Sequence, residues 1–173
     1  TPDAPSKAVA DLTIGLMFAL LRSTQLSNLS IRNKLWKRYF GRRLSESIIG
    51  VIGAGRIGKL VIRDLTSLGC ENVLVNDTDS SIIEKLSNQY SGLTICAKED
   101  IYREADVITM HVPLSQKTRN MIRMDELMRM KKEAVLVNTS RGGIVSENDL
   151  CKVMLDGHLA GAAIDVFETE PYK

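Results

Sequence analysis

Six short apolar runs recur along this chain, and their repetition limits the folds that it can adopt. The runs are SIIGVIG (47–53), NVLVN (72–76), LTIC (93–96), DVITMHV (106–112), AVLVN (134–138) and AGAAIDVF (160–167). A strand that is apolar throughout is buried on both faces, and helical segments separate most of these runs. Strand–helix–strand repeats of this kind predict an α/β fold in which helices cover both faces of a parallel sheet.

Helical spacing follows several of the runs and also precedes the first one. After residue 53, apolar residues recur at the spacing of one helix face, and Gly69 is placed to end that helix. Further helices are expected at 7–22, 81–90, around 123–130 and at 146–155. The last of these opens with Ser146 and Asp149, which have the spacing of a capping box.

Composition indicates one globular domain with its own core and argues against two kinds of partner. The 173 residues are 44% apolar and 25% charged, with a formal net charge of +2. The only basic group, at residues 34–43, is too short for a nucleic-acid surface and is expected to be solvated or partly interfacial. The most apolar stretch, 12–21, is too short to cross a bilayer and is expected to form a buried helix. Neither a nucleic acid nor a membrane is therefore an expected partner.

The cysteines indicate a reducing compartment. Cys70, Cys96 and Cys151 are far apart, odd in number and without the spacing of a metal site. We expect three reduced thiols that are buried or half-buried, no bound metal and a cytoplasmic location.

The first strand runs directly into the glycine-rich loop GAGRIG. Gly53 allows a tight turn, Gly55 lets the backbone approach a pyrophosphate, and Gly58 lets the helix pack closely on the strand. The N–H groups of Arg56 and Ile57 then face the phosphates from the start of that helix. The context of strand, loop and helix predicts a doubly wound Rossmann fold, with six strands in the order 3-2-1-4-5-6.

Asp77 follows the second strand at the position where an acid can accept a hydrogen bond from a ribose hydroxyl. The sequence NDTD around it is also turn chemistry, so Asp77 has a purely local alternative role. Its neighbours Asn76, Thr78 and Asp79 provide no cation for a 2′-phosphate, which predicts NAD rather than NADP as the cofactor.

Several longer stretches together resemble the NAD-binding domain of the D-isomer-specific 2-hydroxyacid dehydrogenases. They are AVADLTIGLMFALLR (8–22), Trp36, RRLSESIIGVIGAGRIG (42–58), ADVITMHVPL (105–114), AVLVNTSRGGIVSENDL (134–150) and AGAAIDVFETEP (160–171). The resemblance covers essentially the whole chain in the family's order. Within the family, the branch of phosphoglycerate and hydroxypyruvate/glycerate dehydrogenases is the most similar.

The resemblance implies catalytic roles for Arg141 and Glu170. Arg141 would bind the carboxylate and carbonyl oxygens of a 2-oxo acid, because a planar fork of donors fits both groups, and Gly142 and Gly143 would leave room for the acid. Glu170 would hydrogen-bond the family's catalytic histidine and raise its pKa. The alternative for Arg141 is an ion pair with a nearby acid that joins two loops.

Further cofactor-binding residues are implied by the same resemblance. Asp165 would contact the nicotinamide carboxamide, and Val112, Pro113, Thr139 and Ser140 would lie along the cofactor.

The resemblance implies that the general-acid histidine of the family, in a Pro-His pair, would lie beyond residue 173. His111 is expected to be structural or to line the cofactor site, and His158 is expected at the opposite edge of the sheet. The chain begins with Thr1 rather than Met, so we expect it to be a piece of a longer protein whose substrate domain is absent here.

The resemblance also implies a division of the chain and an assembly. Residues 1–45 would form an inter-domain helix and dimerisation arm, and residues 46–173 the NAD-binding domain. The helix at 7–22 and the following arm, with large apolar residues at 35–40, would pack across a two-fold axis of a homodimer. The alternative is that the apolar residues of this region fold back on their own sheet.

Two functional hypotheses follow. In the first, the chain belongs to an enzyme that transfers hydride between NAD(H) and a small 2-hydroxy or 2-oxo acid of the 3-phosphoglycerate, glycerate/hydroxypyruvate or D-lactate type. In the second, it is a non-catalytic NAD(H)-sensing module, as in corepressor relatives of the family. A domain similar to S-adenosylhomocysteinase or alanine dehydrogenase would fit the glycine loop but not NTSRGG with DVFETEP.

Overall fold

The computed structural model describes residues 4–171 and contains one sheet of six parallel strands in the order β3-β2-β1-β4-β5-β6. The strands are β1 (Ile49–Ile52), β2 (Val73–Asn76), β3 (Leu93–Ile95), β4 (Val107–Met110), β5 (Val135–Asn138) and β6 (Gly161–Ile164). The predicted fold class and strand order are confirmed. Thr1 and Lys173, which bound the predicted domain ranges, lie outside the described residues.

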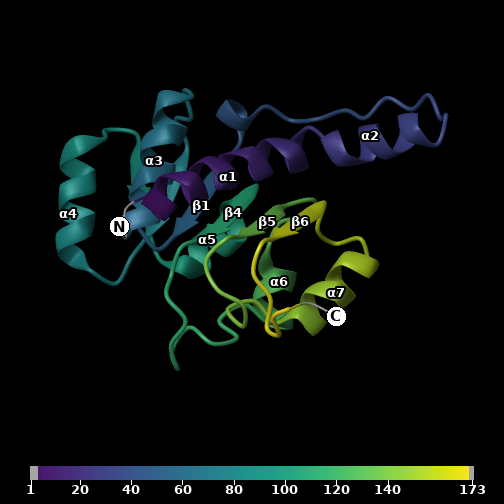
Figure 1. Ribbon diagram of the computed structural model, residues 1–173. Coiled ribbons are helices and arrows are strands. Elements are labelled where there is room, and N and C mark those ends of the chain that lie inside the picture. Colours follow the sequence, from purple (N-terminus) through teal and green to yellow (C-terminus); the bar gives the residue numbers. More distant parts are fainter. Residues whose placement is uncertain (1–3, 172–173) are drawn as a thin grey trace.

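Helices connect the strands and precede the first one (Figure 1). They are α1 (Ala4–Leu21), α2 (Thr24–Arg32), the 3₁₀ helix η1 (Leu44–Glu46), α3 (Arg56–Ser67), α4 (Ser80–Gln89), α5 (Lys98–Glu104), α6 (Met124–Arg129) and α7 (Glu147–Leu155). Neither α2 nor α5 was predicted from the sequence. In α5 the buried residues Ile101 and Tyr102 are adjacent, so seven residues give no repeat from which a helix could be recognised.

Two apolar clusters lie on opposite faces of the sheet. Val51, Val75 and Val137 pack toward α1, α3 and α4, whereas Ile52 and Leu136 pack toward α5, α6 and α7. This alternation along each strand is why the strand sequences are apolar throughout. The edge strand β3 is an exception, since its Thr94 and Ile95 are exposed.

The apolar stretch at 12–21 is buried on one face rather than all round, which corrects the prediction of a buried helix. Met17 and Leu21 are buried against the sheet side, while Leu12 and Phe18 stay 41% and 39% exposed. One face of α1 therefore packs on its own sheet, and the predicted homodimer contact of this region remains a prediction. Among the described residues no single helix is long and apolar enough to cross a membrane, and α1 and α2 meet those criteria only as a pair bent by 62°.

The segment that runs from α2 through residue 43, here called the arm, extends past the sheet and returns along α1 (Figure 1). Leu35, Trp36 and Phe40 are 61%, 82% and 98% exposed. The Ser30 and Tyr39 hydroxyls are 2.8 Å apart and join α2 to the returning part of the arm.

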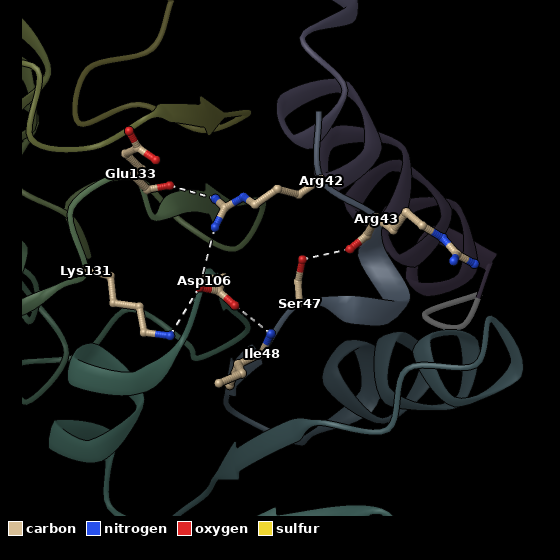
Figure 2. Close-up of polar contacts among 7 residues, drawn as sticks. All are labelled: Arg42, Arg43, Ser47, Ile48, Asp106, Lys131 and Glu133. Carbon is tan, nitrogen blue, oxygen red and sulfur yellow. Dashed lines mark hydrogen bonds and ion pairs between the residues drawn. The ribbon is translucent and has the colours of Figure 1, made fainter. Parts of the chain in front are cut away.

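Asp106 anchors the end of the arm at the amino-terminal edge of the sheet (Figure 2). Its carboxylate accepts the Ile48 N–H at 2.8 Å and pairs with Lys131 at 3.2 Å and Arg42 at 3.5 Å. Arg42 also donates to the Glu133 carbonyl at 2.7 Å. Part of the basic group at 34–43 is therefore paired with the domain rather than solvated.

Two local predictions need correction. Cys70 and Cys96 are buried and half-buried, but Cys151 is exposed because it lies on the outer face of α7. The capping box of α7 forms only in part. Ser146 Oγ accepts the Asp149 N–H at 3.4 Å, whereas the Asp149 carboxylate accepts the Met124 N–H of α6 instead of a donor at Ser146.

Candidate functional site

The glycine loop between β1 and α3 contains two glycines that the protein itself requires. Gly53 has a φ of +93°, and a Cβ there would lie 2.6 Å from the His111 carbonyl oxygen. A Cβ at Gly58 would lie 2.0 Å from the carbonyl oxygen of Gly53. The loop therefore packs against its own helix and against the end of β4, as the motif predicts.

Gly55 differs from the other two, because among the described residues, its two chain neighbours apart, no heavy atom lies within 4 Å of the place where its Cβ would be. No side chain caps the first turn of α3, so the N–H groups of Arg56 and Ile57 remain at an uncapped helix start. An open approach to the backbone beside such a helix start suits a pyrophosphate. The loop thus fits the phosphates of a dinucleotide.

Asp77 closes the loop from the neighbouring strand. One carboxylate oxygen accepts the Ala54 N–H at 2.6 Å, and the other accepts the Asp79 N–H at 2.9 Å. The second bond is the local turn that the sequence allows, while the first ties Asp77 to the glycine loop. These bonds are compatible with the predicted ribose contact, since each oxygen keeps a further lone pair and Asp77 lines the larger cleft described next.

Two adjoining clefts of about 670 and 410 Å³ open where the strands end. Both are lined by Gly55, His111, Val112 and Pro113. The larger cleft also contains Gly53 and Asp77 together with residues of the β3–α5 connection. The smaller cleft contains the following further residues: Pro5, Ser6, Val9, Arg56, Ile57, Thr139, Ser140 and Arg141. Most of the predicted cofactor residues therefore share one continuous edge.

Asn138 organises the loop that carries Arg141. Its side-chain oxygen accepts the Ser140 N–H at 3.1 Å and hydroxyl at 2.7 Å, and its amide donates to the Arg141 carbonyl at 3.1 Å. The Asn138 carbonyl accepts the Asp165 N–H at 3.0 Å. The side chain of buried Asn138, at the end of β5, therefore holds the loop after β5, and its backbone carbonyl holds the start of the segment after β6.

The Arg141 guanidinium lies exposed on the wall of the smaller cleft and donates to the Ser140 carbonyl at 2.6 Å. None of the ion pairs formed among residues 4–171 includes Arg141. The alternative of an arginine that joins two loops through an acid therefore finds no partner in the described chain.

Asp165 and Glu170 line neither cleft, and both are exposed in the segment after β6. Glu170 Oε1 accepts the Phe167 N–H at 3.0 Å within the same segment. A Cβ at Gly142 would lie 1.9 Å from the Phe167 carbonyl oxygen, so the loop of Arg141 and the segment of Glu170 are in direct contact. The resemblance assigned Gly142 to substrate access, and the structure gives it a packing role.

His111 is half-buried at the end of β4, with Nε2 3.0 Å from the Thr109 hydroxyl. Burial lowers the pKa of His111 to about 4, so the ring is neutral near pH 7. Its Nδ1 is buried without a hydrogen-bond partner among the described residues. His158 contacts the Met130 carbonyl at 3.0 Å, at the opposite edge of the sheet as expected.

Several residues that shape the clefts were not predicted from the sequence. Thr118 Oγ donates to the Pro113 carbonyl at 2.6 Å and accepts the Ser115 N–H at 2.7 Å, which shapes the loop over the larger cleft. The buried hydroxyls of Thr13 and Thr139 are 2.8 Å apart and bring α1 to the smaller cleft. Thr13 had a detectable signal, as a polar residue inside an otherwise apolar helical stretch. Within residues 4–171 no group of three or more His, Cys, Asp or Glu side chains is arranged to hold a metal ion.

A doubly wound parallel sheet, a glycine loop at a helix start and an acid at the end of β2 define a dinucleotide-binding domain. The sequence profile of "D-isomer specific 2-hydroxyacid dehydrogenase, NAD binding domain" matches residues 14–173. The chain belongs to this family and is its NAD-binding domain.

Named relatives agree with this assignment. The chain is 37% identical to D-3-phosphoglycerate dehydrogenase of Methanocaldococcus jannaschii over 99% of its own length and 33% of that protein. It is 34% identical to glyoxylate reductase of Thermococcus litoralis over 99% of its length and 54% of that protein. The chain thus spans about a third to a half of these relatives.

Solved structures show the same fold. D-lactate dehydrogenase from Aquifex aeolicus, complexed with NAD and lactic acid, matches 95% of this chain and 49% of that chain, with a TM-score of 0.84 and 28% identity. A D-lactate dehydrogenase from Sporolactobacillus sp. matches 95% of this chain and 48% of that chain, with a TM-score of 0.86 and 34% identity.

Proposed function

We propose that the protein containing this chain transfers hydride between NAD(H) and C2 of a small 2-hydroxy or 2-oxo acid. The observation that carries the proposal is the Arg141 guanidinium, which lies without an acidic partner among residues 4–171 on a cleft lined by the glycine loop. A planar fork of donors beside a dinucleotide cleft suits a carboxylate with an adjacent carbonyl oxygen. The relatives named for phosphoglycerate, glyoxylate and lactate act on acids of this class.

The residues of the chain divide the work. The nicotinamide ring supplies the hydride acceptor or donor when it is bound. The backbone at Gly55, Arg56 and Ile57 would hold the pyrophosphate, with Asp77 at the ribose. Val112, Pro113, Thr139 and Ser140 would line the remainder of the cofactor, with Asp165 at the carboxamide and Gly53 and Gly58 shaping the loop. Arg141 would orient the acid, and Glu170 would support the histidine that the resemblance places beyond residue 173.

Replacement of Arg141 by lysine in the full-length protein tests this function. Lysine keeps the charge but loses the two-pronged geometry, so kcat/KM for 2-oxo acid reduction should fall by about 10²–10³-fold, with NADH affinity unchanged. Arg103→Lys is the matched control, because Arg103 pairs with Asp100 on α5 and lines neither cleft. NADH binding without turnover of any 2-oxo acid by the unaltered protein would instead favour the NAD(H)-sensing module.

The assembly and location belong to the same proposal. Residues 1–45 would serve as an inter-domain helix and dimerisation arm, and 46–173 as the NAD-binding domain, although the 45/46 boundary falls inside η1. The exposed apolar arm would pack across the two-fold axis of a homodimer. Free thiols at all three cysteines fit a cytoplasmic protein, which cell fractionation would test.

A further inference from the structure

Two glutamates join the segment that carries Glu170 to the helix that follows Arg141. The N–H of Glu147, the first residue of α7, donates to Glu168 Oε1 at 3.1 Å. In return, the N–H of Glu168 donates to Glu147 Oε1 at 2.5 Å. The two residues, here called the glutamate clasp, each provide one backbone donor and one carboxylate acceptor. The two bonds close a ring between segments 21 residues apart.

The position of the clasp on α7 favours these bonds. The first N–H groups of a helix have no acceptor within the helix, and Glu168 satisfies the first of them in α7. Its negative charge also lies at the positive end of the helix dipole. Ser146 Oγ accepts a different first-turn donor, the N–H of Asp149, so the clasp adds to the cap and does not compete with it.

The segment held by the clasp is the one that contacts the Arg141 loop. The Phe167 peptide lies between the two sites, with its carbonyl oxygen against Gly142 and its N–H bonded to Glu170. Asp165 is tied to Asn138 at the beginning of this segment. Asn138 therefore holds one end of the segment, and the clasp holds it again three residues later, so the distance from Arg141 to Glu170 depends on both attachments.

We propose that Glu147 and Glu168 are positioning residues that fix Glu170 relative to Arg141. The inference rests on the proposed function, because Arg141 and Glu170 need a set separation only if they serve one active site. Neither glutamate lines a cleft, so the clasp acts through the backbone of the segment and not by contact with substrate or cofactor. Small displacements of catalytic groups have large effects on rate, which makes such a support necessary.

Substitutions in the full-length protein test the clasp. Glu168→Ala and Glu147→Ala each open the ring, and each should lower kcat for 2-oxo acid reduction by about 10-fold to 100-fold. NADH affinity should remain that of the unaltered protein. Gln at either position keeps an acceptor oxygen and should restore most of kcat. Because one opened bond already frees the segment, the double alanine variant should cost much less than the product of the two single effects.

Glu126→Ala is the matched control. The Glu126 carboxylate accepts the Arg123 N–H at 3.0 Å at the start of α6, so it has the same chemistry at a helix that lines neither cleft. It should lower the melting temperature without lowering kcat. If Glu168→Ala loses no more kcat than Glu126→Ala, or if Gln does not restore kcat, the clasp has no positioning role.

Amide hydrogen exchange separates failure of the clasp from failure of the proposed function. The Glu147 amide loses its acceptor in Glu168→Ala, and the Glu168 amide loses its acceptor in Glu147→Ala, so each should exchange faster in that variant. The amides of residues 166–170 should also exchange faster in both variants than in the unaltered protein, whether or not the protein turns over a 2-oxo acid. Unchanged exchange refutes the clasp, whereas an unaltered protein that turns over no 2-oxo acid refutes the proposed function.

Discussion

The carboxyl edge of the sheet and the arm use their residues in opposite ways. At the edge, Gly53 and Gly58 have no space for a side chain, and Asn138 has bonds on both its amide nitrogen and oxygen. In the arm, Trp36 and Phe40 are almost entirely exposed. The edge is closely packed except at the clefts, whereas the arm presents apolar side chains that the other described residues leave exposed.

The carboxyl edge and the arm are exposed in chemically different ways. Around Gly55 the backbone is open but polar, and the neighbouring N–H groups have no cap, which suits a small charged ligand. Around Trp36 the surface is open and apolar, and a large exposed apolar patch marks a protein interface. We therefore expect changes at the edge to alter folding or cofactor binding, and changes in the arm to alter assembly alone.

The largest expected effect contrasts two glycines of one loop. Gly58→Ala places a methyl group 2.0 Å from the Gly53 carbonyl oxygen and should lower the free energy of unfolding by about 3 kcal/mol. Gly55→Ala adds a methyl group where the described residues leave open space, and it should change that free energy by less than about 0.5 kcal/mol. It should nonetheless weaken NADH binding about tenfold, or by about 1.4 kcal/mol. Urea unfolding and NADH fluorescence titration measure both quantities, and equal effects of the two substitutions would contradict the comparison.

The next effect is a dependence of stability on pH at the edge. The pKa of His111 is lowered from 6.5 to about 4 in the folded protein, so below pH 6.5 the unfolded chain binds more protons. The free energy of unfolding should therefore decrease as the pH falls from about 6.5 to about 4, by about 3 kcal/mol in total. His111→Gln should remove this part of the decrease, and His158→Gln, which leaves His111 in place, should retain it. A decrease of the same size in both variants would assign it to other groups.

The sequence predicted the fold well because the strands carry two independent signals. The valines and isoleucines of β1, β4 and β5 are apolar on both faces, and only a central parallel strand needs that pattern. The loop GAGRIG then identified the strand before it as β1, which lies near the middle of the sheet. Helix α5 was missed because its seven residues show no repeat, and α2 because its exposed leucines do not mark a buried face.

The position of a residue in the site could be predicted where that residue contacts near neighbours in the sequence or the adjacent strand, or belongs to a family motif. Gly53, Gly58 and Asp77 are placed by contacts between neighbours in sequence or adjacent strands, so their roles follow from spacing. Glu147 and Glu168 gave no signal, since their reciprocal bonds depend on how the segment after β6 returns to α7. Long-range contacts between exposed polar residues leave no period in a sequence.

A smaller effect concerns the choice of cofactor at Asp77. Its carboxylate should repel a 2′-phosphate, so the chain should bind NADH more tightly than NADPH. Asp77→Ala should narrow the difference by about 1–2 kcal/mol, the value of one charge-assisted bond. The same variant loses the acceptor of the Ala54 N–H, so affinity for NADH should also fall. Titration of cofactor fluorescence with both nucleotides measures the difference, and an unaltered protein without a preference would overturn the role of Asp77.

The smallest expected effect on folding lies in the arm and tests the comparison most directly. Trp36→Ala and Phe40→Ala remove side chains that are 82% and 98% exposed, so the free energy of unfolding of the monomer should change by less than about 0.5 kcal/mol. If the arm covers a second copy of the chain, the double variant should sediment as a monomer at concentrations where the unaltered chain is a dimer.

Leu155→Ala is the matched control, because Leu155 is also 82% exposed but belongs to α7 and not to the arm. It should leave the oligomeric state unchanged. A monomeric unaltered chain at micromolar concentration would mean that the arm of this chain is covered by something other than a second copy. The arm and the carboxyl edge act independently only if the arm variants change the oligomeric state while their affinity for NADH stays that of the unaltered chain. A change in both quantities would mean that the arm is coupled to the cofactor site.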